Sequence, residues 1–158
     1  RVALCGDLDE ASACLGLARA VSRNEDARLV LATIQRDLHG AMAEVAAPRE
    51  DASRFRSVDG TRVAWLEDVI RRWEAFVPPS QGFILAGDCL GSAAAALART
   101  VVRRAEREVS TLTFAGQLEN PELLRYLNRL SSLCFVLALL ENREAGVDTP
   151  TPARPPTP

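Results

Sequence analysis

The sequence is poor in side chains that bind transition metals. It has one histidine, His39, and four cysteines, Cys5, Cys14, Cys89 and Cys134, and no two cysteines form a Cys-x-x-Cys pair. Structural zinc sites need four such ligands at characteristic spacings. We therefore predict no metal site, and we interpret Cys14 and Cys134 as small core residues on apolar helix faces. Free thiols are also typical of a reducing, cytoplasmic setting.

Lysine is absent, so all 19 basic residues are arginines, and 21 acidic residues leave a formal net charge of −2. Acids and bases are mixed along the chain, which gives no basic footprint for DNA or RNA. We find no stretch that reads as a membrane span and no signal-peptide pattern. We therefore expect a cytoplasmic protein that binds neither nucleic acid nor membrane. The use of arginine alone reflects genome composition or the recognition of phosphate, which the planar guanidinium favours.

What the sequence does contain, nearly throughout, is helical periodicity. Apolar residues such as Val30, Ile34 and Leu38 recur at three- and four-residue steps, the pattern of an amphipathic helix. The pattern predicts helices at residues 7–21, 26–45, 58–76, 89–109 and 121–144. Short connections and no strand signal indicate an all-α, five-helix antiparallel bundle over residues 1–146, followed by a proline-rich disordered tail over residues 147–158. The fifth helix is apolar on more than one face, so we expect another subunit to cover it.

Local signals mark the ends of two helices. Asp7 followed by Glu10 predicts a capped start of the first helix. Asn120 before Pro121 predicts the start of the fifth, because asparagine caps free N–H groups and proline suits the first helical position. Gly146 suits the end of that helix.

The densest polar cluster lies in the second half of the fourth predicted helix. Arg99, Arg103 and Arg107 are four residues apart and share one helical face, and Glu106 can orient Arg103. Guanidinium groups this close repel one another unless carboxylates or a polyanion stand between them. The cluster is therefore either a phosphate site, with triphosphate the natural ligand, or a solvated face with local Arg–Glu pairs. Taken alone, the cluster favours the solvated face.

Three other positions admit both a functional and a structural interpretation. Asp9 either complements the dipole of the first helix or pairs with an arginine of the cluster. Asn128, unfavourable within a helix, either binds a ligand or fills a buried polar gap. Phe83 either belongs to the core or lines an apolar pocket for a flat ligand. His39 is interpreted as structural.

Six segments, in order and at matching intervals, resemble one family, the PduO-type ATP:cob(I)alamin adenosyltransferases. The arginine block and the block after Tyr126 are the specific matches, and the others are weak alone. The segments are GDLDE at 6–10, LGLAR at 15–19, IQRDL at 34–38, FILAG at 83–87, ARTVVRRAER at 98–107 and YLNRLS at 126–131.

The resemblance implies a homotrimer of five-helix bundles with active sites between subunits. Such enzymes transfer the 5′-deoxyadenosyl group of ATP, supplied with Mg²⁺, to cob(I)alamin and release triphosphate. The reduced cobalt is the nucleophile, so no serine, cysteine or histidine is needed for attack. Cobalamin is thus a substrate, and an adenosylcobalamin-dependent enzyme is an expected partner.

Carried over by position, the resemblance assigns roles to the candidate residues. Arg103 is expected to contact the triphosphate and stabilise the leaving group, and Arg99 to pair with Asp9 of the partner subunit. Phe83 stands where the family has the aromatic that displaces the lower ligand of cobalamin, which leaves a four-coordinate cobalt(II) that is easier to reduce. The remaining expected nucleotide-binding residues are Glu106, Asn128 and Arg104.

Several positions depart from the family pattern. A phosphate-binding loop of the form Thr-Gly-Asp-x-Gly-x-Thr would precede Arg1, and the usual Pro-Gly-Gly-Ser turn reads Ala-Gly-Asp-Cys at 86–89. Ala96 replaces a common histidine, and Ser132 a common aspartate. The alternative function is therefore a catalytically degenerate homologue that acts as a cobalamin or nucleotide carrier or sensor. A purely structural bundle is disfavoured, because packing does not require Arg99, Arg103, Glu106 and Asn128 together.

Overall fold

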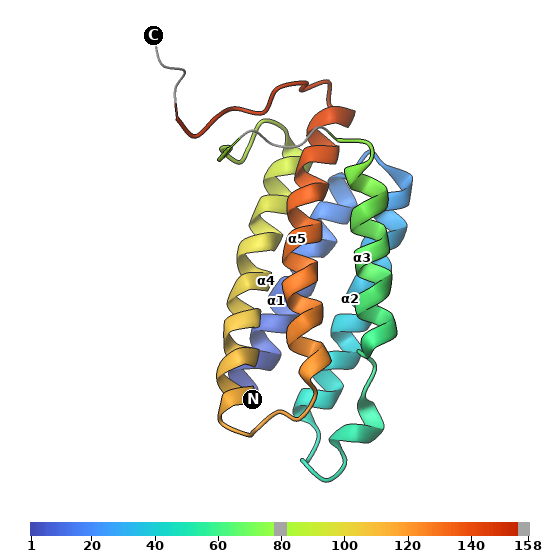
Figure 1. Ribbon diagram of the computed structural model, residues 1–158, viewed down its shortest axis with the longest axis vertical. Helices are drawn as coiled ribbons and strands as arrows, with labels where there is room; N and C mark the ends of the chain where they lie inside the picture. Colours follow the sequence, from blue (N-terminus) through green and yellow to red (C-terminus); the bar gives the residue numbers. More distant parts are fainter. Residues whose placement is uncertain (78–81, 155–158) are drawn as a thin grey trace.

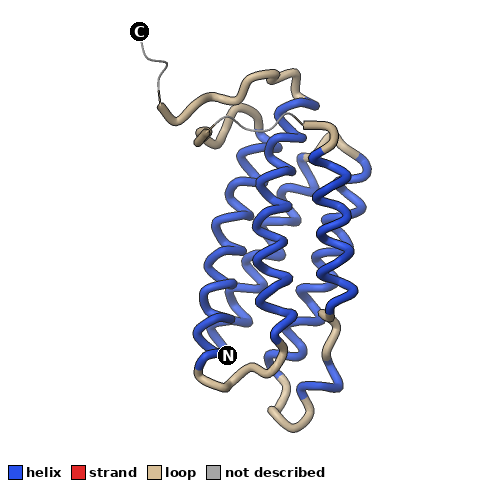
Figure 2. Tube along the Cα trace, viewed as in Figure 1, coloured by secondary structure: helices blue, strands red, loops and turns tan. Residues whose placement is uncertain are grey.

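A computed structural model of the chain describes residues 1–77 and 82–154. Figure 1 shows α3, α4 and α5 in front of α1 and α2, with the chain running up and down so that consecutive helices are antiparallel. Figure 2 shows that the regular elements are helical. The elements are α1 (Val2–Val21), α2 (Glu25–Ala46), a short 3-10 helix η1 (Ala52–Phe55), α3 (Gly60–Glu74), α4 (Leu90–Phe114) and α5 (Pro121–Glu144). The predicted all-α five-helix bundle is confirmed.

Two helix boundaries differ from the prediction by more than one turn, for the same physical reason. α1 begins at Val2, so Asp7 lies inside the helix and does not cap it. The fully buried Leu4 and Leu8 continue the apolar stripe one turn further back than the acidic signal suggested. The C-terminal end of α4 extends to Phe114, because Leu112 adds one more buried position. Burial of one further apolar residue therefore outweighs the local end signals.

The starts of the other helices follow side-chain caps. Asn24 accepts a hydrogen bond from the N–H of Ala27 at α2, and Asn120 one from Glu122 at α5, as predicted. The cap of α4 is unusual, because the Cys89 sulfur accepts from the N–H of Ser92 while the Ser92 hydroxyl accepts from the N–H of Cys89. Cysteine is not a common cap, so the sequence pattern did not identify this reciprocal arrangement.

α5 is the central helix and packs between α3 and α4. From Leu133 to Asn142 every residue except Phe135 is buried, so the chain's own helices cover most of the second apolar face that we expected a subunit to cover. By length and composition α5 is apolar enough to cross a membrane, which the sequence analysis did not anticipate, but 67% of its most apolar window is buried inside the bundle. Phe76, the last residue of the third predicted helix, lies beyond the end of α3 and is 55% exposed.

Small residues let α4 approach α5 closely. Gly91, Ala94, Ala95 and Ala98 of α4 are all buried. A Cβ added at Gly91 would lie 2.5 Å from the Glu141 carboxylate, so only glycine fits at this crossing. These residues draw the N-terminal half of α4 against the C-terminal half of α5, where the larger leucines fill the core.

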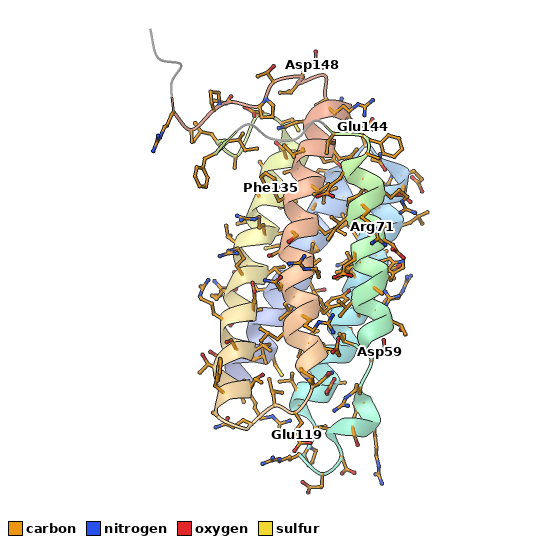
Figure 3. The ribbon with its side chains drawn as sticks, in the orientation of Figure 1. Asp59, Arg71, Glu119, Phe135, Glu144 and Asp148 are labelled. Carbon is orange, nitrogen blue, oxygen red and sulfur yellow. The ribbon has the colours of Figure 1, made fainter. Side chains whose placement is uncertain are left out.

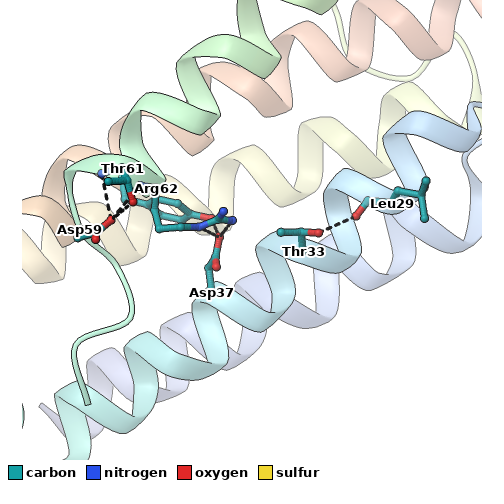
Figure 4. Close-up of polar contacts among 7 residues, drawn as sticks. Leu29, Thr33, Asp37, Asp59, Thr61 and Arg62 are labelled. Carbon is teal, nitrogen blue, oxygen red and sulfur yellow. Dashed lines mark hydrogen bonds and ion pairs between the residues drawn. The ribbon is translucent and has the colours of Figure 1, made fainter. Parts of the chain in front are cut away.

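A polar cluster joins α2, α3 and α5 on the other side of the bundle. The Asp37 carboxylate accepts hydrogen bonds from Arg62 at 2.5 Å and from the hydroxyl of the buried Tyr126 at 2.6 Å, both to Oδ2. The Arg62 guanidinium also lies 4.3 Å over the ring of Trp65. Figure 4 shows the Arg62–Asp37 contact between the two helices. Burial and the Asp37 charge raise the pKa of Tyr126 well above its ordinary value, so the phenol stays a hydrogen-bond donor.

Tyr126→Phe is expected to lower the free energy of unfolding by about 1.5 kcal/mol, because the half-buried Asp37 carboxylate loses one of its donors. Urea denaturation followed by circular dichroism measures the change. Thr33→Val is the control, since the Thr33 hydroxyl donates only to Leu29 O within an exposed turn of α2 and its loss is expected to matter by less than about 0.5 kcal/mol. Equal effects of the two substitutions would contradict a special role for the Asp37 cluster.

Candidate functional site

The candidate residues of α4 and α5 lie along the outer edge of the seam between these two helices. Two hollows open there, with volumes of about 620 and 610 Å³. We call them the arginine hollow and the aromatic hollow. The arginine hollow lies beside the C-terminal half of α4, and the aromatic hollow lies beside its N-terminal half.

The arginine hollow collects most of the predicted nucleotide-binding residues. The Asn128 amide donates to the Glu106 carboxylate at 2.8 Å and accepts from Arg129 at 3.2 Å through Nε. α3 adds Glu67 to the wall. The hollow is lined by Val63, Glu67, Arg103, Glu106, Arg107, Ser110, Leu124, Arg125, Asn128 and Arg129.

The charge of this hollow is positive, because four arginines face two glutamates. The Arg103 side chain is exposed and makes no hydrogen bond or ion pair with any residue that the structure describes. Arg107 donates only to the backbone oxygen of Arg103, at 3.1 Å. Guanidinium groups without carboxylate partners in a concave surface are suited to a polyanion. The geometry therefore favours the phosphate-site interpretation over the solvated face.

The aromatic hollow is formed by the 82–86 loop together with the facing ends of α4 and α5. The Phe83 ring is 88% exposed at its rim rather than part of the core. Arg99 lies 6.0 Å from the ring centre of Phe135 on α5, and Figure 3 shows Phe135 toward the end of the bundle where this loop lies. The lining is Gly82, Phe83, Ile84, Leu85, Ala86, Ser92, Ala96, Arg99, Phe135, Ala138 and Asn142.

The structure thus divides residues that the sequence analysis had grouped together. Arg99 and Arg103 are one helical turn apart, yet Arg99 lines the aromatic hollow and Arg103 the arginine hollow. A ligand that spans both hollows would therefore pass between these two side chains. This adjacency matters for a reaction that must bring a nucleotide and a flat apolar ligand into contact.

Arg104 lies outside both hollows. Its guanidinium pairs with the carboxylates of Asp7 and Glu10 on α1, and the hydrogen bond that it donates to Asp7 raises the pKa of Arg104. The expected role of Arg104 in nucleotide binding has no geometric support within one chain, because its guanidinium is already paired with two carboxylates of α1. Asp9 is exposed on α1 and has no partner within residues 1–77 and 82–154, so any pair with Arg99 requires a second chain.

Sequence reasoning missed several residues that line the two hollows. Asn128, Phe135 and Asn142 are spaced by seven and therefore share one face of α5. That spacing was readable in the sequence, but Phe135 and Asn142 stand in a run of apolar residues that pointed to the core. Glu67 carried no signal, because its position depends on how α3 packs against α5.

The C-terminal segment holds the loop that carries Phe83. The N–H of Leu85 donates to Thr151 O and that of Ala153 to Phe83 O, both at 2.8 Å. The Asp88 carboxylate accepts from the Thr151 hydroxyl at 2.6 Å and from its N–H at 3.0 Å, which lowers the pKa of Asp88. Figure 1 shows this segment beside the loop. Residues 151–153 of the expected disordered tail are thus hydrogen-bonded, and residues 155–158 lie outside the described chain.

None of the described thiols and carboxylates forms a metal site. Within residues 1–77 and 82–154 no three or more His, Cys, Asp or Glu side chains converge to hold a metal ion. Cys134 is fully buried, and burial raises its pKa to about 12, as expected for a core thiol. Cys14 is half-buried, and burial and the Glu10 charge raise its pKa.

Comparison with known proteins identifies the family of this chain. A family model described as cobalamin adenosyltransferase matches residues 1–141. The chain belongs to the cobalamin adenosyltransferase family. A cobalamin adenosyltransferase of Cupriavidus metallidurans is 37% identical over 147 residues, which are 92% of this chain and 77% of that protein.

Other members of the family show how far the likeness extends. The corrinoid adenosyltransferase PduO of Salmonella typhimurium is 36% identical over 146 residues, which cover 92% of this chain but 43% of that protein. The chain therefore spans less than half the length of this relative. A variant PduO-type ATP:corrinoid adenosyltransferase from Lactobacillus reuteri, complexed with cobalamin and ATP, superposes with a TM-score of 0.84 at 29% identity over 98% of this chain and 83% of that one.

Asp88→Ala is expected to release residues 151–153 from the 82–86 loop, because Thr151 loses both side-chain contacts. The backbone amides of Leu85 and Ala153 should then exchange hydrogen at a rate close to that of unprotected amides. Asp148→Ala is the control, since this exposed carboxylate of the same segment has no described partner. Because the pKa of Asp88 is lowered, the contact should persist at neutral pH and weaken only as the pH falls through that lowered value. Unchanged protection in Asp88→Ala would refute the assignment.

Proposed function

We propose that this protein transfers the 5′-deoxyadenosyl group of ATP to cob(I)alamin, giving adenosylcobalamin and triphosphate. The observation that carries the proposal is the adjacency of the arginine and aromatic hollows on one helical seam, with Arg103 and Arg99 one turn apart. One hollow has the charge for a triphosphate and the other the apolar walls for a corrin ring. Membership of the family and the solved relative complexed with cobalamin and ATP support this reading.

ATP occupies the arginine hollow in this proposal. Arg103 contacts the triphosphate, and its unpaired guanidinium leaves it available to stabilise the charge that develops on the leaving group. Glu106 and Asn128, already hydrogen-bonded to each other, give the nucleotide a rigid polar wall. Mg²⁺ bound to ATP would neutralise phosphate charge, and Glu67 and Glu106 are the two carboxylates of this hollow that would help to hold it, which suits an ion that retains water and phosphate ligands.

The chemistry requires a nucleophile that the protein does not supply. The cobalt of cob(I)alamin donates an electron pair to C5′ of ATP and forms a Co–C bond. The C5′–O bond breaks, and its electron pair leaves with triphosphate. The chain's own contribution is to hold both reactants at the boundary of the hollows and to meet the negative charge of the departing phosphate. No side chain of the seam has to act as the nucleophile in this division of labour.

The corrin ring occupies the aromatic hollow, against Phe135 and Ala138. Phe83 stands at the rim with its ring exposed, where it can take the place of the lower cobalt ligand. A four-coordinate cobalt(II) is easier to reduce, so Phe83 acts before the transfer step.

The assembly we propose is a homotrimer with the site between subunits. One face of α1 is apolar and uncovered in a single chain: Val2 is 89% exposed, Leu17 46%, and Gly6 between them leaves room for a close neighbour. Asp9 lies on this helix and has no described partner, which fits a pair between Arg99 and Asp9 of the partner subunit. Such a trimer would work in the cytoplasm and pass its product to an adenosylcobalamin-dependent enzyme.

Arg103→Ala is expected to lower the rate of adenosylation at least a hundredfold, the usual effect of losing a group that stabilises leaving-group charge. Anaerobic absorbance of cob(I)alamin with MgATP measures the rate. Arg71→Ala is the matched control, because Arg71 pairs with Asp68 on the exposed face of α3. Light scattering should report a trimeric mass for both variants. Normal adenosylation by Arg103→Ala would exclude the assigned role, and a monomeric wild type would exclude the shared site.

Phe83→Ala is expected to slow adenosylation that starts from cob(II)alamin and a reductant much more than adenosylation of prereduced cob(I)alamin. The exposed ring contributes little to folding, so the thermal midpoint should not change. The two assays run side by side on the same preparation provide the control. Equal losses in both assays would show that Phe83 does not act on the lower ligand.

A further inference from the structure

An unsatisfied amide lines the aromatic hollow. Asn142 stands on the last turns of α5 and is 3% exposed, and its Oδ1 is buried without a hydrogen-bond partner. No other residue that the structure describes bonds to this side chain, although the backbone oxygen of Asn142 accepts from Val147. Leaving a buried amide unpaired is unfavourable, so such a group in a native protein points to a partner outside the chain.

The other polar groups nearby are already engaged. The Ser92 hydroxyl donates to Cys89 O at 3.0 Å and accepts from the N–H of Cys89. The adjacent Glu141 accepts a hydrogen bond from the Ser22 hydroxyl. Arg99 lies against the Phe135 ring. Asn142 is therefore the neutral polar side chain in this wall that remains free to bind a ligand.

A second buried asparagine shows what a structural role requires in this protein. Asn120 is 2% exposed, and its Nδ2 donates to Glu44 and to Val58 O, both at 3.0 Å. Its Oδ1 caps α5 by accepting from Glu122. Both ends of the Asn120 amide are satisfied by the fold, whereas the fold leaves the Asn142 amide for something else.

We propose that Asn142 recognises the primary amide groups at the rim of the corrin ring. This inference rests on the proposed function, because it assumes that the ring occupies the aromatic hollow. A corrin is a flat apolar macrocycle edged by acetamide and propionamide side chains. Phe83 and Phe135 offer apolar contact to the ring but no hydrogen bond to its edge. An amide pairs with another amide through one donor and one acceptor, and Asn142 has both.

Such a contact gives the hollow selectivity as well as affinity. Apolar walls alone discriminate weakly among flat ligands, whereas a buried polar group rejects a ligand that leaves it unpaired. A haem-like macrocycle edged by ionised carboxylates has no hydrogen to donate at its edge, so it would leave the Asn142 Oδ1 unpaired. The same wall therefore favours amidated corrinoids over tetrapyrroles of similar size.

Asn142→Leu separates this role from a structural one, because leucine keeps the branched shape and removes both polar atoms. We expect cob(II)alamin to bind about tenfold more weakly, the effect of one lost hydrogen bond. The binding of cobinamide, which lacks the lower base but keeps the corrin amides, should weaken by the same factor. The KM for ATP should not change, and the thermal midpoint should stay the same or rise, since the unsatisfied group is gone. Anaerobic absorbance titration and differential scanning fluorimetry supply the readouts.

Asn120→Leu is the control, and it should lower the thermal midpoint without selectively weakening corrinoid binding. Asn142→Ala, which cannot overfill the site, replaces Asn142→Leu if the larger side chain unfolds the protein. Unchanged cob(II)alamin binding in a folded Asn142 variant would overturn the inference while leaving the adenosyltransferase proposal intact. If the wild type itself binds no corrinoid, the proposed function fails first, and the inference fails with it.

Discussion

The close antiparallel packing of α4 against α5 is the constraint on which the rest of the structure depends. Gly91 and the alanines of α4 remove side-chain bulk from one helix, and the leucines of α5 fill the space from the other. The Glu141 carboxylate, against which no Cβ fits at Gly91, sets the register of the two helices at one end. Because packed helices do not slide freely, every residue on the outer edge of this seam has a defined neighbour on the other helix.

That register is what turns separate sequence motifs into a site. Glu106 meets Asn128 across the seam, and about two turns away along both helices Arg99 meets Phe135. At the edge of the seam, Glu106, Asn128 and Phe135 are only partly buried. The residue that precedes each of them in the chain is buried in the core. The helices alone therefore form the positive hollow, and the 82–86 loop completes the apolar hollow beside it. Phe83 reaches the site from this loop, and the segment around Thr151 holds the loop in place.

Periodicity predicted the five helices, and the sequence motifs singled out Arg99, Arg103, Glu106, Arg107 and Asn128, which line the two hollows. These features depend on neighbours within one helix, which a sequence displays directly. Contacts between helices were less accessible: the pairing of Arg104 with Asp7 and Glu10 joins residues more than 90 positions apart, and no local pattern announces it. The hydrogen bonds that Asp88 accepts from Thr151 give a structural reason for the acid that departs from the family pattern in this turn. Asn142 looked like core until the structure showed that nothing in the core pairs with it.

The central claim is that the two hollows bring ATP and a reduced corrinoid together for transfer. The most direct test is anaerobic absorbance of chemically reduced cob(I)alamin mixed with MgATP and the purified protein, with triphosphate measured in the same sample. The account predicts conversion to adenosylcobalamin with one triphosphate released for each corrinoid converted. Saturable binding of ATP or corrinoid without conversion would contradict it, and would identify a carrier or sensor that kept the seam and lost the reaction.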